Sequence, residues 1–547
     1  MFVKRIHLAM SLWLSCIVAA VLVSTTAVAD ELPRVERRGQ ATQLIVDGKP
    51  YIALGGELHN SSSSSPAFMA PIWDRLTQNG VRTVIGAASW ELVERQEGRF
   101  DFAAVDDLVR QAKAHGMRLV MLWFGAFKNA VSTYAPTWVR RDLERFPRAE
   151  RDPNAKIRGL AANMEPGATL SVFNDRLLSA DARAFAALMR HLREVDRDHT
   201  VIMVQVENEV GLLGDSRDRS ALATDAWSRP VPAELMKYLQ DNRAVLRPQV
   251  LDTWARQGFR TSGTWAEVFG TGKAADEIFM SWGFGRYVGS IAKAGSAQYP
   301  LPMYANAWLG PQADEPEPGD YPSGGPVARM TDIWKSAAPS LAFTSPDIYI
   351  DDFVGTLEDF HRPNNPIFVP EARPDAGNAF IALAEYKAVG FSPFGIEDFA
   401  PEHELFKAYK VLDTMLPEIA QGQQNGSIRG FRLAMREQRK FTFGRYDVSI
   451  LGPGSNPWMF GVGTPPPANS TGYGLVIQTG EDEFLIVGRA VDVKFTADGR
   501  PAEMDSVEEG VFENGRWIPG RTLDGDERYF LFPVDALRTV RVRLLRH

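Results

Sequence analysis

The chain has 547 residues, of which 45% are hydrophobic and 23% charged, so its composition is that of an ordinary globular protein with a sizeable core. Single cores stop growing at about 250–300 residues, and the length therefore indicates more than one domain. The net charge of -8 and the sequence pI of about 5.7 argue against a nucleic-acid partner, and no basic run suggests one.

The first 29 residues (1–29) have the features of a secretory signal peptide. A basic start at residues 4–7 precedes an apolar stretch at 8–23, and residues 27–29 (Ala-Val-Ala) form a small-x-small cleavage site. We expect cleavage after this site, export to the periplasm or the cell exterior, and no stable membrane insertion afterwards. An uncleaved anchor helix is the alternative. The sole cysteine, Cys16, lies in this segment, which leaves no disulfide or thiolate metal site in the mature chain.

Apolar, β-branched runs alternate with stretches of helical periodicity over most of the chain. The runs predict eight strands, at Tyr51–Glu57, Thr83–Trp90, Arg118–Phe124, Val201–Glu207, Pro302–Trp308, Asp347–Ile350, Pro366–Pro370 and Gly390–Ile396. The helical stretches include Ala67–Asn79, Asp101–His115, Asp181–Val195 and Asn378–Val389. This alternation predicts an α/β fold, a (β/α)8 TIM barrel. A doubly wound open sheet is the alternative, but no Gly-rich phosphate loop follows the first strand.

The composition changes after Gly426, where helical periodicity fades and Gly and Pro clusters separate short alternating runs. These runs include Phe441–Val448, Gly474–Gln478, Phe484–Val487 and Val540–Leu544. They predict a C-terminal all-β sandwich domain at residues 425–547, after a barrel domain at 30–424. Residues 212–300 form a long insertion between the fourth and fifth strands, which we expect to be a lid or a cleft wall.

Two of the predicted strands are followed by carboxylates that stand out. Glu209 ends residues 204–209 (Val-Gln-Val-Glu-Asn-Glu) after strand four, and Glu371 ends residues 368–371 (Phe-Val-Pro-Glu) after strand seven. Active sites of such barrels lie at the carboxyl ends of the strands, where strands four and seven face each other across the mouth. Two carboxylates placed this way could supply the acid and the nucleophile of a glycosidase. The alternative is that each is an ordinary solvated loop residue.

Two segments resemble glycoside hydrolase family 35, the β-galactosidases. Residues 205–211 (Gln-Val-Glu-Asn-Glu-Val-Gly) are similar to the family's Gln-Ile-Glu-Asn-Glu-Tyr-Gly signature. Residues 90–102 are similar to its Trp-Asn-x-His-Glu-Pro-x-x-Gly-x-Tyr-Asp-Phe block, although His and Pro are replaced by Val and Arg. The resemblance implies a divergent bacterial branch of the retaining barrel clan. It also implies that Glu209 is the acid/base, that Glu371 is the nucleophile, and that Asn208 binds the sugar 2-hydroxyl.

Further substrate-binding residues are expected at the strand ends, namely Glu57, Lys128, Asn129, Trp308 and Tyr349. A structural salt bridge is the alternative for Glu57, and rim packing for Trp308. Tyr349 is expected to donate a hydrogen bond to the nucleophile. No cofactor is expected, and the histidines show no metal-ligand spacing, so no metal is expected either.

The resemblance implies a secreted, retaining exo-β-galactosidase whose partner is a carbohydrate. Its expected substrates are terminal β-D-galactosyl residues of oligo- and polysaccharides, with plant cell-wall xyloglucan-type side chains as one context. Two alternatives stay open. One is another retaining β-glycosidase on the same barrel, such as an endo-glycanase or an arabinosidase, and the other is a non-catalytic carbohydrate-binding protein.

Overall fold

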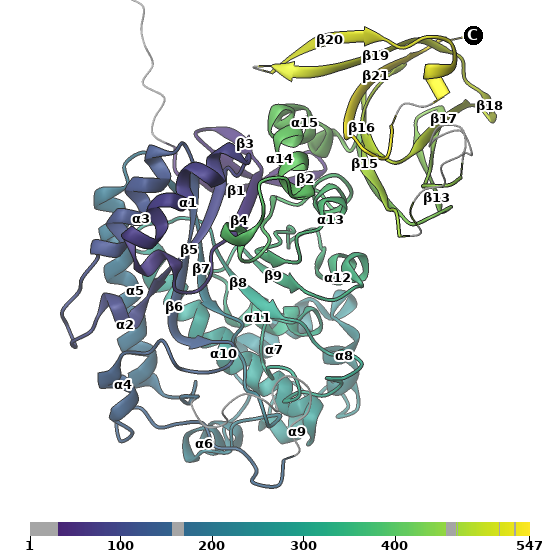
Figure 1. Cartoon of the computed structure of the whole chain (residues 1–547). Coiled ribbons are helices and arrows are strands. Elements are labelled where there is room, and N and C mark those ends of the chain that lie inside the picture. The colour runs from purple at the N-terminus through teal and green to yellow at the C-terminus, as the bar shows by residue number, and fades with distance from the viewer. Residues whose placement is uncertain are drawn as a thin grey trace, which may run out of the picture. The chain divides into compact units, whose positions relative to one another are not determined.

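Eight parallel strands form the central barrel of the protein (Figure 1). The computed structural model describes residues 31–155, 169–455, 467, 469–513, 515–529 and 532–546, and the predicted leader at 1–29 lies outside these residues. The barrel strands are β4 (Ala53–Glu57), β5 (Thr83–Ser89), β6 (Arg118–Lys128), β7 (Val201–Asn208), β8 (Met303–Trp308), β9 (Phe343–Ile348), β10 (Glu371–Ala372) and β11 (Gly390–Phe391). Each strand pairs in parallel with the next, and the predicted TIM barrel is confirmed.

The barrel closes between its last two strands. The backbone N–H of Val369, just before β10, donates to Gly390 O at 3.2 Å, and Ser392 N–H donates to Val369 O at 2.9 Å. β11 pairs in turn with β4. All strand carboxyl ends therefore meet at one rim, which is where this fold places its sites.

Helices that follow the strands cover the outside of the barrel (Figure 1). The main ones are α1 (Pro66–Gln78), α3 (Ala103–Ala114), α5 (Asp175–Val195), α10 (Lys273–Ser296), α11 (Thr331–Ala337), α12 (Phe353–Phe360), α13 (Ala376–Phe380), α14 (Glu404–Thr414) and α15 (Leu416–Asn425). Local sequence sets their ends: Ser65 and Asn174 accept hydrogen bonds from the first-turn N–H groups of α1 and α5. α15 ends at Gly426, whose φ of 72° suits a left-handed C-terminal cap.

An antiparallel sheet precedes the barrel. It consists of β1 (Arg34–Arg38), β2 (Ala41–Val46) and β3 (Lys49–Tyr51). Leu44 and Val46 of β2 belong to a buried cluster that includes Ala53 and Phe343, the first residues of β4 and β9. The sheet thus packs against the end of the barrel opposite the strand carboxyl ends, and the predicted strand Tyr51–Glu57 is divided between β3 and β4.

Two antiparallel sheets follow the barrel, as the predicted β domain requires. One contains β12 (Ile428–Leu433), β15 (Gly472–Gly480), β16 (Glu483–Arg489), β21 (Arg538–Leu544), β19 (Met504–Glu513) and β20 (Arg516–Thr522), and the other contains β13 (Gln438–Phe443), β14 (Tyr446–Leu451), β17 (Asp492–Ala497) and β18 (Arg500–Pro501). Alternating residues of both sheets, such as Val448 and Ile486, share one buried core. The division into separate domains at 424/425 stays a prediction, because Ile428 and Leu475 belong to the barrel's own cluster.

The segment 212–300 is largely helical and ends in α10, which packs against α5 and α11. Among the described residues, no helix combines the length and the apolarity that crossing a membrane requires.

Candidate active site

A cavity of about 650 Å³ opens at the carboxyl ends of the barrel strands. Its lining includes six of the eight predicted site residues, namely Lys128, Asn129, Glu209, Trp308, Tyr349 and Glu371. Asn208 and Glu57 do not line it. The other lining residues are Asn60, Leu309, Gln312, Asp314, Glu315, Asp347, Ile350, Arg373 and Phe394. The structure describes all of residues 212–300, and none of them lines this cavity, so the expected lid or cleft wall is not seen here.

Three buried carboxyl groups converge at the centre of the cavity. Oxygens of Glu209, Asp347 and Glu371 all lie within 4.8 Å of one another, although the three residues come from different strand ends. Retaining glycosidases hold their two carboxyl groups about 5–5.5 Å apart, whereas inverting enzymes need about 6.5–9.5 Å to admit a water molecule. The separation of Glu209 and Glu371 therefore fits direct attack on an anomeric carbon.

The backbone at the end of β7 is strained. Glu207 and Glu209 have φ angles of 63° and 44°, a left-handed conformation that non-glycine residues rarely adopt. Such residues cost about 1–3 kcal/mol each and cluster at functional sites. The turn ends the regular strand alternation, and it directs the Glu209 backbone N–H to Asn306 Oδ1 at 3.0 Å.

A chain of hydrogen bonds orients the predicted nucleophile. Lys128 Nζ donates to Asn208 Oδ1 at 2.9 Å, and Asn208 Nδ2 donates to Glu371 Oε1 at 3.0 Å. The lysine thereby fixes which end of the Asn208 amide faces the carboxylate. Lys128 Nζ also donates to Asn129 Oδ1 at 2.6 Å, so the lysine links two of the predicted residues, Asn129 and Asn208.

The other Glu371 oxygen accepts a hydrogen bond from Tyr349 OH at 2.9 Å. Burial and the charge of Glu371 raise the pKa of Tyr349, so that the hydroxyl keeps its proton and stays a donor. Trp308 lies at the cavity wall, where its Nε1 donates to Glu315 Oε2 at 3.3 Å. The sugar-binding roles of these residues stay predictions.

Glu209 has the electrostatic surroundings of an acid. Burial, followed by the charge of Glu371, raises the pKa of Glu209 to about 8, while the charge of Lys128 acts in the opposite direction. A carboxyl group with such a pKa is protonated at neutral pH and can give its proton to a leaving oxygen.

Asn306 links the acidic groups, and the sequence did not single it out. It lies on β8, where its Nδ2 donates to Asp347 Oδ2 at 2.7 Å and to Glu371 Oε1 at 3.3 Å. Asp347 was noted only as part of a strand. A polar residue at an inward position of an otherwise apolar strand is the one signal that could have indicated Asn306.

Two buried acids, Glu207 and Asp181, bind the backbone of β6 just before Lys128. Glu207 accepts hydrogen bonds from the backbone N–H groups of Ala126 and Phe127 at 3.1 and 2.8 Å, and Asp181 accepts from Ala126 at 3.0 Å. These bonds fall where the β6–β7 pairing shifts register, between Trp123 and Lys128. Glu207 is thus buried in the core and supports the irregular end of β6.

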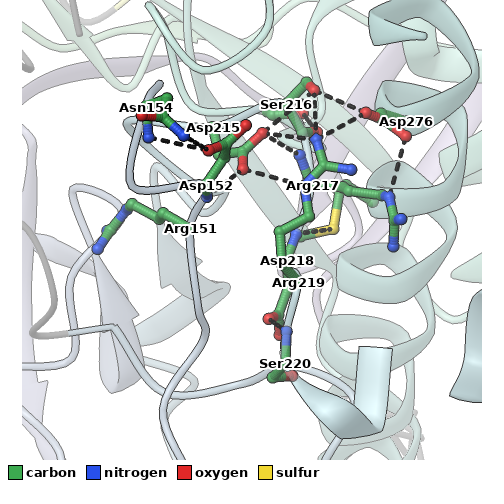
Figure 2. A network of polar contacts seen from close by, with 12 residues as sticks. Arg151, Asp152, Asn154, Asp215, Ser216, Arg217, Asp218, Arg219, Ser220 and Asp276 are labelled. Carbon is green, nitrogen blue, oxygen red and sulfur yellow. Dashed lines mark hydrogen bonds and ion pairs between the residues drawn. The ribbon is translucent and has the colours of Figure 1, made fainter. Parts of the chain in front are cut away.

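A polar network holds the loop that follows Glu209 (Figure 2). Arg219 donates to Asp215 at 2.8 and 3.0 Å and to Asp276 at 3.1 Å, and Ser216 Oγ donates to Asp276 at 2.7 Å. Asp276 belongs to the first turn of α10. The loop is therefore tied to the helical layer of the barrel by residues that do not line the cavity.

Glu57 lies in the protein interior with 1% of its surface exposed. Neither of its carboxyl oxygens has a hydrogen-bond partner among the described residues, and the expected alternative of a salt bridge is not seen there. Burial, followed by the charge of Glu371, raises its pKa well above the usual range, which makes it a neutral group. Glu57 does not line the cavity, and its contact with sugar stays a prediction.

An eight-stranded barrel whose mouth holds two closely spaced glutamates is an arrangement found in glycoside hydrolases. Two family models match the chain. One, described as beta-galactosidase, matches residues 67–261, and the other, described as a domain of unknown function (DUF5597), matches residues 405–533.

Curated relatives agree with the first of these matches. A beta-galactosidase of Xanthomonas manihotis is 30% identical over 212 residues, which are 38% of this chain and 28% of that protein. Beta-galactosidase 11 of Arabidopsis thaliana is 35% identical over 104 residues, 18% of this chain and 12% of that protein. The matches span less than a third of the relatives' own length. They confirm the predicted resemblance to β-galactosidases, but none of them names family 35, and that narrower assignment is not confirmed.

Solved structures with a similar fold include two kinds of glycosidase. A beta-galactosidase from Bacillus circulans sp. alkalophilus is 13% identical with a TM-score of 0.43, covering 67% of this chain and 56% of that one. A beta-mannanase from the blue mussel Mytilus edulis is 12% identical with a TM-score of 0.40, covering 71% and 97%. Similarity at this level carries no conclusion about the substrate.

Proposed function

We propose that the protein is a retaining, exo-acting β-galactosidase. The observation that carries the proposal is the convergence of Glu209 and Glu371, whose oxygens lie within 4.8 Å in the cavity at the barrel mouth. The galactoside preference is supported by the resemblance to β-galactosidases over residues 67–261.

In the first step, Glu371 attacks the anomeric carbon while Glu209 gives its proton to the departing glycosidic oxygen. The C–O bond to the aglycone breaks as the bond to Glu371 forms. Hydrogen bonds from Asn208 and Tyr349 hold the two Glu371 oxygens in fixed positions before attack. This arrangement reduces the reorganisation that the reaction requires.

In the second step, Glu209 acts as a base. The charge of Glu371 is lost once the glycosyl-enzyme has formed, and with it one of the two causes of the high pKa of Glu209. Glu209 is by then ionised, and it takes a proton from the water molecule that attacks the anomeric carbon. Attack from the face opposite to Glu371 releases the sugar with its original configuration.

We further propose that the protein is exported, on the strength of the leader-like features of residues 1–29. Mass spectrometry of the protein isolated from its natural host would identify the mature N-terminus. A mature chain that still begins at Met1 would contradict export by cleavage.

A panel of aryl β-glycosides tests the sugar assignment. We expect the galactoside to be hydrolysed faster than the glucoside, mannoside, fucoside and α-arabinoside, and NMR of the first-formed product to show the β-anomer. A faster rate with another sugar would mean that the protein is a different retaining glycosidase. No turnover of any glycoside would favour a carbohydrate-binding protein.

Matched variants test the two roles. Glu209→Gln and Glu371→Gln should each lower turnover of a poorly activated galactoside by about 100-fold or more. With a dinitrophenyl leaving group, which needs no protonation, Glu209→Gln should keep its first step and Glu371→Gln should not. Equal behaviour of the two variants with this substrate would contradict the assigned roles.

A further inference from the structure

Asp347 is a third acid in the cavity, and the mechanism above does not use it. It lies on β9 with 2% of its surface exposed, and its oxygens lie within 4.8 Å of those of Glu209 and Glu371. Its Oδ2 accepts a hydrogen bond from Asn306 Nδ2 at 2.7 Å. Its Oδ1 is buried, and no N–H or O–H group of a described residue donates to it.

The charges around Asp347 do not balance a second carboxylate. The titratable groups that face it are Glu57 of β4, Lys128 of β6, Glu209 after β7, Tyr304 of β8, Tyr349 after β9 and Glu371 of β10. Lys128 is the one cation in this set. Arg373 also lines the cavity, but it is paired with Asp351 at the surface.

Among these acids, Glu371 is the one best placed to carry the single negative charge that Lys128 can balance. It accepts hydrogen bonds from Asn208, Asn306 and Tyr349, and such donors favour an ionised carboxylate. A second charge beside it would be buried without a counter-ion, which is strongly unfavourable.

We propose that Asp347 is a positioning residue for Glu209, a neutral carboxylic acid that donates a hydrogen bond to the Glu209 carboxylate after Glu209 has given up its proton. The inference rests on the proposed glycosidase function and deepens it. Burial, followed by the charges of Glu371 and Glu209, raises the pKa of Asp347 well above its usual range, in agreement with a proton on this group. The hydrogen bond between the two side chains also lowers the pKa of Glu209.

The proton count stays balanced through the cycle. Glu209 loses its proton to the leaving oxygen in the first step, and Asp347 stabilises the resulting carboxylate without transferring its own proton. In the second step Glu209 takes a proton from the attacking water. Asp347 therefore ends the cycle as it began, and its role is to stabilise the Glu209 carboxylate and so to limit how far burial and Glu371 raise the pKa of Glu209.

The pair Asp347→Asn and Asp347→Ala tests the proposal through the pH profile. An Asn side chain can accept from Asn306 and donate to Glu209, so Asp347→Asn should leave the basic limb of the kcat/KM profile within about half a pKa unit of the wild type. Asp347→Ala removes the donor, and the basic limb should rise by about one unit. With a dinitrophenyl galactoside, where the second step limits turnover, kcat of the Ala variant should fall about tenfold while the Asn variant is spared.

Three outcomes would overturn the proposal. If Asp347 were ionised, Asp347→Asn would remove a neighbouring negative charge and lower the basic limb by about one unit or more. A merely structural role would lower kcat in both variants and leave both pH profiles unchanged. The third outcome is the absence of a protonated carboxyl band from infrared difference spectra of wild type minus Asp347→Asn near neutral pH.

The infrared experiment also separates this proposal from the proposed function. The wild type should show one protonated carboxyl band that the Asn variant lacks. Absence of this band overturns the proposal even if no glycoside is hydrolysed. The measurement requires only the Asn variant, so it can be made even if the Ala variant fails to fold. Lack of β-galactosidase activity in the wild type, with the band present, would instead reject the proposed function.

Discussion

Neutralising Glu371 should lower the pKa of Glu209. Two causes raise that pKa from 4.5 to about 8, first burial and second the charge of Glu371. Two unit charges whose oxygens lie within 4.8 Å interact by about 3 kcal/mol at an effective dielectric constant of about 20, which corresponds to about two pKa units. Glu371→Gln should therefore bring the pKa of Glu209 to about 6. It should stay above 4.5, because burial remains.

Carbon-13 NMR of protein labelled at the glutamate side-chain carboxyl groups would measure this shift, with Glu209→Gln to assign the signal. Glu277 offers an internal control. It is buried on α10, burial raises its pKa to about 7, and it is paired with Arg329 rather than with the cavity acids. Its titration should be unchanged in Glu371→Gln.

Two results would refute the reasoning. A pKa of Glu209 that stays at about 8 in Glu371→Gln would mean that the two groups do not feel each other, and the shared site would be wrong. A fall to the ordinary value would mean that burial contributes nothing, contrary to the 8% exposure of Glu209.

Three further predictions concern single side chains. Tyr349→Phe removes a hydrogen-bond donor to Glu371, and a hydrogen bond to a charged group contributes about 1.5–3 kcal/mol. The kcat on an aryl galactoside should therefore fall about 10- to 150-fold while Tm is unchanged. An unaltered kcat would show that the reaction does not use this bond. Glu209 has a folded-state pKa above its unfolded value, so its contribution to stability is full below pH 4.5 and is lost as pH rises through 8. Above pH 8, Glu209→Gln should thus raise the free energy of unfolding by on the order of 5 kcal/mol, and below pH 4.5 it should leave it equal, as urea unfolding at both would show. Glu57→Gln should leave KM within about threefold because Glu57 lies outside the cavity lining, whereas loss of a direct hydrogen bond to sugar costs about fivefold or more.

The barrel could be predicted because each of its layers leaves a periodic signal. Buried parallel strands are continuous apolar runs, and amphipathic helices repeat with the helical period. Strand ends were less certain. β6 continues to Lys128, four residues past the predicted end, because Glu207 and Asp181 satisfy the backbone of its irregular portion. Such support comes from residues distant in sequence and leaves no local pattern.

The N-terminal sheet had a signal that the prediction did not use. β2 and β3 are joined by Asp47-Gly48, and their φ angles of 50° and 74° are those of a tight hairpin turn. Asp-Gly between alternating residues is a strong hairpin indicator. The turn could therefore have indicated the hairpin of β2 and β3 ahead of the barrel.

The convergence of Glu209 and Glu371 could be predicted because position in the strand order fixes which rim residues face each other. Asn306 and Asp347 could not, since their importance lies in what they contact. Asn306 is a single amide on β8, yet it bonds the Glu209 backbone, Asp347 and Glu371 at once. Only the closed barrel brings these three partners together.

The same contacts explain why local rules fail at this rim. Folding alone would favour an apolar residue where Asp347 is buried, and an ordinary backbone where Glu207 and Glu209 are left-handed. Each departure lowers stability, and each surrounds or orients the group at position 209. An acid that must be neutral in one step and ionised in the next requires buried surroundings with few compensating charges, and such surroundings are unfavourable for folding. The residues that local propensity would reject are thus the ones that the proposed chemistry needs.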